Sequence, residues 1–233
     1  MGRAVAVRMA KAGADVVVND LDSSAAAETA ESLISDGGSA IAVAGDISDS
    51  TFVDLLVSSA AEGYGEINIL VNAAGILRRT AVIDMPEAEW DLLMNVNLKG
   101  TFLSSKAVLA SMRSSGWGRI VNFSSTAGKT TSTLGGAHYT ASKHAVLGLT
   151  RHMAMEEAPH GITVNAVCPG LINTEMVQKE VDDELLKNYV DGFPIHRLGE
   201  PSEAAELVAF LASDRAAYIT GQGFDISGGD LMV

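Results

Sequence analysis

Tyr139 and Lys143 stand four residues apart in a run, 137–143, that is typical of a helix. Positions four apart lie on one face of a helix, so this spacing places a phenol beside an ammonium. A free tyrosine has a pKa near ~10, and a nearby positive charge favours its phenolate form. Such a pair could donate or accept a proton near neutral pH. Chance also supplies this spacing on exposed helical faces, so other residues must support the interpretation.

Further motifs follow apolar runs elsewhere in the chain: Asn72 to Gly75, Ser124 with Ser125, and Pro169 with Gly170. Together with the Tyr-xxx-Lys pair, this ordered set resembles the short-chain dehydrogenase/reductase family. Members of that family are single-domain oxidoreductases that depend on a nicotinamide cofactor. The resemblance extends from Gly2 to the C-terminus.

The beginning of the chain departs from that family. Family members open with a strand and a glycine-rich loop, Thr-Gly-xxx-Gly-x-Gly, whereas this sequence begins at the last glycine of the loop, Gly2. We therefore expect an N-terminally truncated sheet that lacks the first strand and most of the phosphate loop. The resemblance places that strand between the strands near 16–20 and 67–72, and each apolar side chain uncovered by its loss is worth roughly 1.5–3 kcal/mol. A chain that starts at Met1 is expected to fold poorly and to bind NAD weakly.

The composition fits one compact enzyme domain. The chain has 233 residues, 47% of them hydrophobic, and a net charge of −13. That charge argues against nucleic-acid binding and offers no basic patch for acidic lipids. No apolar run approaches the ~20 residues of a membrane span. The only cysteine, Cys168, excludes an internal disulfide, and the histidines lack metal-ligand spacing, so we expect a cytoplasmic protein without a metal.

Short apolar runs alternate with helical stretches, the pattern of βαβ units. The expected buried strands lie at 16–18, 40–44, 67–71, 120–123, 162–168 and 224–226. The expected helices lie at 3–12, 23–36, 49–63, 87–113, 138–158 and 201–213, with a cap near Asp22 and a proline start at Pro201. We therefore predict an α/β fold, a doubly wound parallel sheet of the Rossmann type, in a single domain over 1–233.

The segment 172–198 is the least regular part of the chain. It mixes apolar residues with the acidic run 180–184. In the resembled family this segment is the substrate lid, and its amphipathic pattern fits a mobile flap. A surface helical excursion would show the same pattern, and the sequence does not separate the two interpretations.

Asp20 follows the strand 16–18, and open parallel sheets bind ligands at the carboxyl ends of their strands. A carboxylate there could accept hydrogen bonds from both adenosine ribose hydroxyls and would repel a 2′-phosphate. The resemblance therefore implies NAD, with NADP less favoured. An aspartate that caps a helix or supports a turn is the alternative.

The resemblance assigns further cofactor contacts to the beginning of the chain and to strand ends: Gly2, Asp46, Ile47, Asn72, Ala73, Ala74, Gly75, Tyr139, Lys143, Pro169, Gly170, Ile172 and Thr174. Small residues are needed where a backbone approaches a flat ligand, and Gly75 could also adopt positive φ. Ordinary turns at strand ends use the same residue types, so these motifs are only moderately specific.

The resemblance assigns proton transfer to four side chains, Asn97, Ser125, Tyr139 and Lys143. Tyr139 would be the general acid in reduction and the general base in oxidation. Lys143 would lower the tyrosine pKa and bind ribose, and Asn97 would kink its helix and hold a water that touches the lysine.

Ser125 would hydrogen-bond the substrate oxygen. It is preferred to Ser124 because Gly128 then falls three residues later, as in the family pattern. A Ser-His-Asp triad is the competing chemistry, but no Gly-x-Ser-x-Gly elbow supports it.

These residues imply hydride transfer between NAD(H) and the carbon of a secondary alcohol or ketone, so the partner is a small alcohol or carbonyl compound. The resemblance also implies a homotetramer, formed through two long helices and the C-terminal strand region. One alternative is a 3-oxoacyl-carrier-protein reductase that uses NADPH, although Asp20 and the net charge weigh against it. An inactive truncated fragment or pseudoenzyme is the alternative of another class.

Overall fold

The computed structural model describes the backbone of residues 1–180 and 183–233, with several side chains between 176 and 188 outside the described part. Its strands are β1 (Asp15–Val18), β2 (Ser39–Ala42), β3 (Ile69–Asn72), β4 (Gly118–Phe123), β5 (Ile162–Pro169) and β6 (Gly223–Ile226). β1 pairs with β2, and β3, β4, β5 and β6 follow one another in a second sheet. All of these pairings are parallel, so the expected α/β class and parallel sheet are confirmed.

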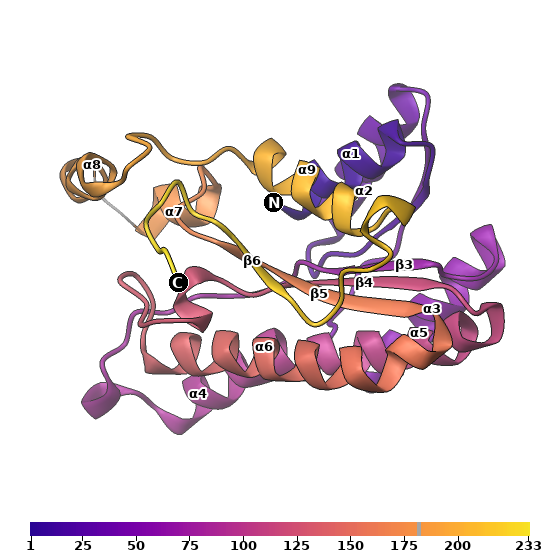
Figure 1. The fold of residues 1–233 in the computed structure, drawn as a ribbon, viewed down its shortest axis with the longest axis horizontal. Helices are drawn as coiled ribbons and strands as arrows, with labels where there is room; N and C mark the ends of the chain where they lie inside the picture. The colour runs from indigo at the N-terminus through magenta and orange to yellow at the C-terminus, as the bar shows by residue number, and fades with distance from the viewer. Residues whose placement is uncertain (181–182) are drawn as a thin grey trace.

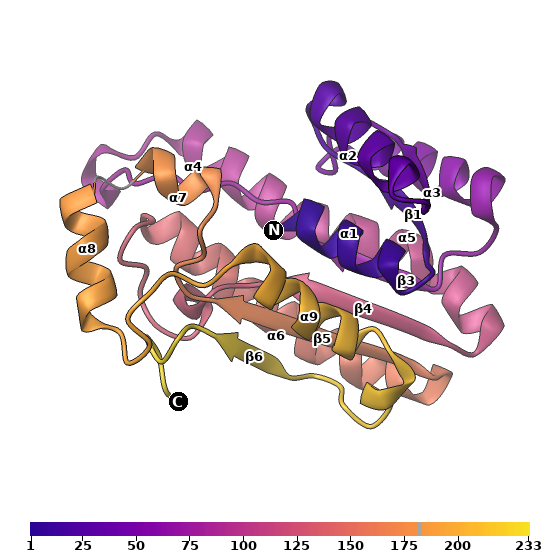
Figure 2. The ribbon, with the colours of Figure 1, turned by 90° about the horizontal axis from the view of Figure 1, so that it is seen from above.

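Helices cover both faces of the strands. They are α1 (Gly2–Lys11), α2 (Ser23–Ser35), α3 (Ser50–Tyr64), α4 (Glu87–Met94), α5 (Gly100–Ser115), α6 (Ala137–Glu157), α7 (Glu175–Glu180), α8 (Asp183–Gly192) and α9 (Pro201–Leu211). In Figure 1, α1, α2 and α9 lie above the sheet, and α3, α4, α5 and α6 lie below it. α7 and α8 lie beyond the arrowheads of β4 and β5, at the carboxyl ends of the strands (Figure 2).

β4 builds a core on each face because successive side chains of a strand point in opposite directions. Ile120 packs in one cluster with Met112 of α5 and Val164 of β5. Phe123 packs in another cluster with Val208 of α9. Burial of each such side chain contributes roughly 1.5–3 kcal/mol. This doubly covered strand therefore holds the loop after Phe123 at a fixed position.

The helix starts signalled by the sequence are present. The Asp22 carboxylate accepts hydrogen bonds from the backbone N–H groups of Ser24 and Ala25, so it caps α2. α9 begins at Pro201, and the side chains of Glu200 and Glu203 form a capping box there. These local devices satisfy backbone donors that would otherwise lack partners at the helix ends.

Four expected segments differ in the structure. The helix expected over 87–113 is not continuous, since a π-helical segment, Asn95–Lys99, separates α4 from α5. The strand expected from 67 begins only at Ile69, and the one expected to reach 44 ends at Ala42. In its described residues, the irregular segment 172–198 contains the helices α7 and α8.

The sheet is divided between β1 and β3. Among the described residues, no hydrogen-bonded ladder joins these two strands, and this is the position where the family resemblance places a further strand. α1 packs against α9, β1 and α2, and α3 packs against α5. Helix packing therefore holds the two-stranded sheet beside the four-stranded one.

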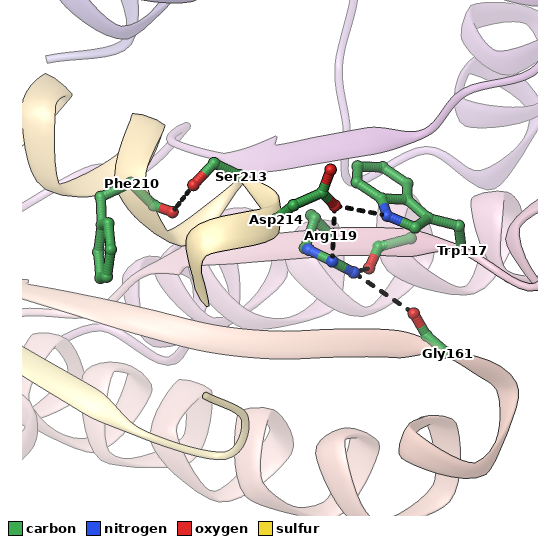
Figure 3. A network of polar contacts seen from close by, with 7 residues as sticks. Trp117, Arg119, Gly161, Phe210, Ser213 and Asp214 are labelled. Atoms are coloured by element: carbon green, nitrogen blue, oxygen red, sulfur yellow. Dashed lines mark hydrogen bonds and ion pairs between the residues drawn. The ribbon is translucent and has the colours of Figure 1, made fainter. Parts of the chain in front are cut away.

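Arg119 is a buried cation near the amino end of β4 (Figure 3). Its guanidinium lies 4.3 Å from the centroid of the Trp117 ring and 3.4 Å from a carboxylate oxygen of Asp214. The indole N–H of Trp117 donates to the same oxygen at 3.0 Å. Burial lowers the pKa of Arg119, and the charge of Asp214 opposes that shift. This network fastens the turn after α9 to the end of the sheet opposite the carboxyl ends.

Candidate active site

Tyr139 and Lys143 lie near the N-terminus of α6, on one face, as their spacing predicts. The ammonium nitrogen of Lys143 is 5.6 Å from the centroid of the Tyr139 ring. Lys143 is only 5% exposed, and its Nζ donates a 2.8 Å hydrogen bond to the carbonyl oxygen of Phe123 at the end of β4. The pair therefore stands at the carboxyl end of the sheet, the edge where open parallel sheets bind ligands.

Burial shifts the pKa of both groups toward their neutral forms. It raises the pKa of Tyr139, and a hydrogen bond with Ser125 partly opposes that rise. It lowers the pKa of Lys143 to about 8. The lysine was expected to lower the tyrosine pKa, but in this structure the group that favours the phenolate is Ser125.

Ser124 and Ser125 end β4 in different surroundings. Ser124 is buried, and its Oγ donates a 2.9 Å hydrogen bond to the carbonyl oxygen of Lys143, which fastens α6 to the sheet. Ser125 is half-buried, and its Oγ lies 3.5 Å from the carbonyl oxygen of Pro169. Ser125 is the group that favours the phenolate form of Tyr139, so it is the serine associated with the phenol. Its contact with a substrate stays a prediction.

Asn97 lies inside the π-helical segment and is 1% exposed. Its Oδ1 accepts the backbone N–H of Ile76 at 2.8 Å, and its Nδ2 donates to the carbonyl oxygen of Ile76 at 2.9 Å. Nδ2 also donates to Oγ of Ser142 on α6 at 3.2 Å. The expected local departure from a regular helix is therefore present, and it turns an amide toward the backbone that follows β3. The water assigned to Asn97 stays a prediction.

Gly75 brings the chain after β3 close to two buried polar groups of the site. A Cβ at this position would lie 3.2 Å from Oδ1 of Asn97 and 3.5 Å from Nζ of Lys143. Gly75 does not have the positive φ that its residue type allowed. Glycine allows the backbone to approach these two groups closely, because a side chain would crowd the space beside the Asn97 amide and the Lys143 ammonium.

The two predicted adenosine contacts stand at neighbouring strand ends. Asp20 is exposed after β1, and its Oδ1 accepts the N–H of Asp22 at 3.0 Å. Asp20 therefore supports a turn, whereas the helix cap is Asp22. Asp46 is exposed after β2 and accepts the N–H of Ser48 at 2.8 Å, and Ile47 beside it is half-buried. Their contacts with a cofactor stay predictions.

The side chain of Asn72 is engaged inside the protein. Its Nδ2 donates to Ser105 of α5 at 3.0 Å and to Oδ1 of Asn122 on β4 at 2.8 Å. A cofactor contact at Asn72 would therefore come from its backbone. Ala73 and Ala74 follow, and a Cβ on Gly2 would lie 3.5 Å from that of Ala73, so the start of α1 reaches this strand end.

The remaining predicted cofactor residues follow β5. The N–H of Gly170 donates to the carbonyl oxygen of Ile226, so the turn begins against β6. Ile172 is buried and bridges to Gly199. The hydroxyl of Thr174 accepts the N–H of Val177 at 3.4 Å and supports the start of α7. These structural contacts leave the cofactor roles as predictions.

Comparison with known proteins decides the family. A family model described as enoyl-(acyl carrier protein) reductase matches residues 1–230. The chain belongs to the short-chain dehydrogenase/reductase family. A 3-oxoacyl-(acyl-carrier-protein) reductase of Synechocystis sp. is 40% identical, over 100% of this chain and 93% of that protein. A (3R)-3-hydroxyacyl-CoA dehydrogenase of Canis lupus familiaris is 39% identical, over 100% of this chain and 92% of that protein.

A solved short-chain dehydrogenase/reductase structure gives the same result at the level of the fold. A 3-oxoacyl-(acyl-carrier protein) reductase from Brucella melitensis with bound NAD superposes with a TM-score of 0.91 and 35% identity. The match covers 100% of this chain and 87% of that one. The family resemblance carried by the Tyr139 and Lys143 motif is therefore confirmed.

Sequence reasoning missed side chains that position the family residues in this member. Ser142 donates to the carbonyl oxygen of Tyr139 at 2.8 Å and accepts from Asn97, so it joins the π-helical segment to α6. His138 is fully buried, and its Nε2 lies 3.1 Å from a carboxylate oxygen of Glu89 on α4. No sequence signal identified these pairs, because their partners lie 45 and 49 residues away.

The described residues contain neither a membrane-spanning helix nor a metal-binding cluster. No helix there is long and apolar enough to cross a membrane. In the same part of the chain, no group of three or more His, Cys, Asp or Glu side chains could hold a metal ion. Cys168 is a buried free thiol whose pKa is raised to about 11, chiefly by burial, so it stays protonated at neutral pH.

Proposed function

We propose that this protein is an oxidoreductase that interconverts a secondary alcohol and a ketone, with NAD(H) as its redox cofactor. The observation that carries the proposal is the convergence of Tyr139, Lys143, Ser125 and Asn97 at the carboxyl end of the sheet. The relatives of this chain are named as reductases of 3-oxoacyl groups and dehydrogenases of 3-hydroxyacyl groups. Both names describe chemistry between a C–OH and a C=O group.

Tyr139 is the proton carrier in this proposal. Its hydroxyl donates a proton to the substrate oxygen in reduction and accepts one in oxidation. Ser125, which favours the phenolate form of Tyr139, steadies the same substrate oxygen. Lys143 carries its ammonium toward the cofactor ribose, and Asn97, which lies close to Gly75 and Ser142, holds the relay water. The substrate carbon exchanges a hydride with the bound nicotinamide.

The residues present fit two parts of a dinucleotide, the nicotinamide ring and the adenosine ribose. A Cβ at Gly75 would fill the approach to Asn97 and Lys143, so glycine keeps that approach open for a flat ring. Asp20 offers a carboxylate at the end of β1, and one of its oxygens already holds a turn N–H. A carboxylate there accepts ribose hydroxyls and repels a 2′-phosphate, which supports NAD over NADP.

A second candidate is a 3-oxoacyl-carrier-protein reductase that uses NADPH. The name of the Synechocystis relative favours it. The net charge of −13 weighs against an acidic carrier, and Asp20 weighs against the 2′-phosphate. The two candidates share the same proton chemistry at Tyr139 and differ in cofactor and substrate.

We also propose a lid, an oligomeric state and a cellular location for the enzyme. The segment 172–198 acts as the substrate lid of one domain that covers 1–233. The active form is a homotetramer, formed through the long helices α5 and α6 and the region of β6. The protein resides in the cytoplasm, in keeping with one buried free thiol.

The deciding experiment measures cofactor oxidation and reduction by purified protein with NAD(H) and NADP(H), over a panel of secondary alcohols, ketones and 3-oxoacyl thioesters. Tyr139→Phe is expected to lower turnover by ~10²–10⁴ while cofactor affinity stays nearly unchanged, because only the proton carrier is lost. A Tyr139→Phe protein that keeps more than about a tenth of the wild-type rate would contradict this mechanism.

A further inference from the structure

An apolar cluster surrounds the ring of Tyr139. Leu77 and Leu134 form its buried centre, at 9% and 7% exposure. Packed against them are Tyr139, Leu171, Val177, Leu186 and Tyr189. These side chains come from the loop after β3, the loop before α6, α6 itself, the segment after β5, and the helices α7 and α8. The only polar atoms among these seven side chains are the two phenol oxygens, and none of the seven carries a charge at neutral pH.

The loop that carries Leu134 is held firmly against the Tyr139 ring. A Cβ at Gly135 would lie only 2.7 Å from Cδ1 of Tyr139, so the backbone of the loop touches the ring. The N–H of Ser132 donates to Oγ1 of Thr140 at 3.1 Å, and the N–H of Gly135 donates to Oγ of Ser132 at 2.7 Å. Leu134 is therefore positioned by the same helix that positions the phenol.

Helix α8 completes the far side of the cluster. The hydroxyl of Tyr189 lies 3.5 Å from the carbonyl oxygen of Thr133, in the same loop. Its ring and the side chain of Leu186 pack on the Leu77 and Leu134 centre. The surface beside the phenol is thus apolar on the side of the loop and on the side of the helix.

We propose that the enzyme selects substrates whose reacting carbon bears an apolar arm, and that this arm lies against Leu77, Leu134 and Tyr189. This inference rests on the proposed function. A substrate oxygen at the Tyr139 hydroxyl places its carbon beside a ring that belongs to the cluster, so one substituent of that carbon falls on apolar side chains. Sugars and polyols are disfavoured, because burying each hydroxyl there without a partner carries a desolvation cost.

The first experiment measures kcat/KM for 2-butanol, 2-hexanol and 2-octanol, with sorbitol as the polyol. We expect kcat/KM to rise by up to about fourfold for each methylene, the value of full burial in an apolar environment. Sorbitol is expected to be turned over at least a hundredfold less efficiently than 2-octanol. The inference would be overturned if kcat/KM did not change along the alcohol series, or if kcat/KM for sorbitol equalled that for 2-octanol.

Two variants locate the effect. Tyr189→Ser and Leu134→Ser are expected to reduce the dependence on chain length to less than about twofold per methylene, while 2-butanol is still oxidised. Ile83→Ser is the matched control, because Ile83 is 91% exposed and lies outside the cluster. It should leave the series unchanged. If Leu134→Ser fails to fold, the half-buried Tyr189 keeps the comparison available.

A binding measurement separates this inference from the proposed function. Tyr139→Phe lacks the proton carrier and is not expected to reduce a ketone during the measurement. The dissociation constants of 2-butanone, 2-hexanone and 2-octanone can therefore be measured by calorimetry with this variant in the presence of NADH. Affinity that rises with chain length supports the apolar arm even if no alcohol is turned over, in which case only the proposed function fails. Affinity that is independent of chain length overturns the inference even if turnover is observed.

Discussion

Gly135→Ala is expected to impair catalysis without disturbing the fold, because it pushes directly on the Tyr139 ring. The added Cβ would lie 2.7 Å from one ring carbon and 2.9 Å from the next two tyrosine atoms. To reach ordinary contact the ring and the loop must separate by about 0.7 Å. The φ of Gly135 is not positive, so alanine introduces no backbone strain of that kind.

The magnitude follows from the sensitivity of catalysis to position. A misplacement of about 1 Å at a reacting group can reduce the rate by ~10², so a smaller displacement of the phenol should reduce kcat by roughly 10- to 100-fold. Cofactor affinity should remain within about threefold of wild type, since the ring movement leaves Asp20 and the end of β3 in place. Steady-state kinetics and a fluorescence titration with NADH would measure the two quantities.

Gly148→Ala is the control for this variant. Gly148 lies on α6, the helix that carries Tyr139, and a Cβ there would meet nothing within 4 Å. Alanine is favoured over glycine inside a helix by ~0.5–1 kcal/mol, so this variant should melt slightly higher and keep full activity. A Gly135→Ala enzyme with kcat within about twofold of wild type would refute the reasoning, since it would show that the loop does not fix the phenol.

Three further predictions address other parts of the site. Burial lowers the pKa of Lys143 from 10.5 to about 8, so the folded state penalises its charge below pH 8, and the penalty disappears as the pH rises toward 10.5. At pH 7, Lys143→Met should therefore have a free energy of unfolding up to about 3 kcal/mol higher than that of wild type, measured by urea denaturation. This difference should shrink toward pH 10, and a difference that grows with pH would contradict the prediction. Asp20→Asn should reduce the ratio of NAD to NADP affinity at least about tenfold, since hydrogen bonds to charged groups are worth ~1.5–3 kcal/mol, and an unchanged ratio would remove Asp20 from its role. Ser125→Ala should lower kcat by about 100-fold, within the range of ~10²–10⁴ for proton transfer. Ser124→Ala should mainly lower stability, by ~1–3 kcal/mol, because the Lys143 carbonyl then lacks that hydrogen-bond partner. Equal losses of activity in the two variants would contradict the assignment.

The features that the sequence predicted well depend on short-range physics. The Tyr139 and Lys143 spacing fixes one face of a helix wherever that helix lies, and the structure has both on α6. The cap at Asp22 and the start at Pro201 are also local, because their partners stand within three residues. Apolar runs such as 162–168 predicted a strand because a strand buried on both faces is mostly apolar, although β5 also buries Thr163 and Asn165.

Two features were predicted only through the family resemblance, because they depend on partners far along the chain. The choice between Ser124 and Ser125 is supported by the contact of Ser124 with the Lys143 carbonyl, 19 residues away. The break in the helix expected over 87–113 coincides with Asn97, whose amide meets Ile76, 21 residues away. No local propensity contains this information, since both asparagine and serine also occur in ordinary loops and caps.

Asn72 and Gly75 illustrate how one motif divides between core and site. The motif predicted ligand contacts over 72–75 as a unit, yet the Asn72 amide is committed to Ser105 and Asn122 beneath the sheet. Gly75, three residues later, is the member that approaches Lys143. The Asn72 amide joins β3 to β4 and α5, and so fixes the position of the backbone that leads to Gly75. The polar residue of the motif therefore acts through the backbone that it positions, and the residue without a side chain leaves space open beside Asn97 and Lys143.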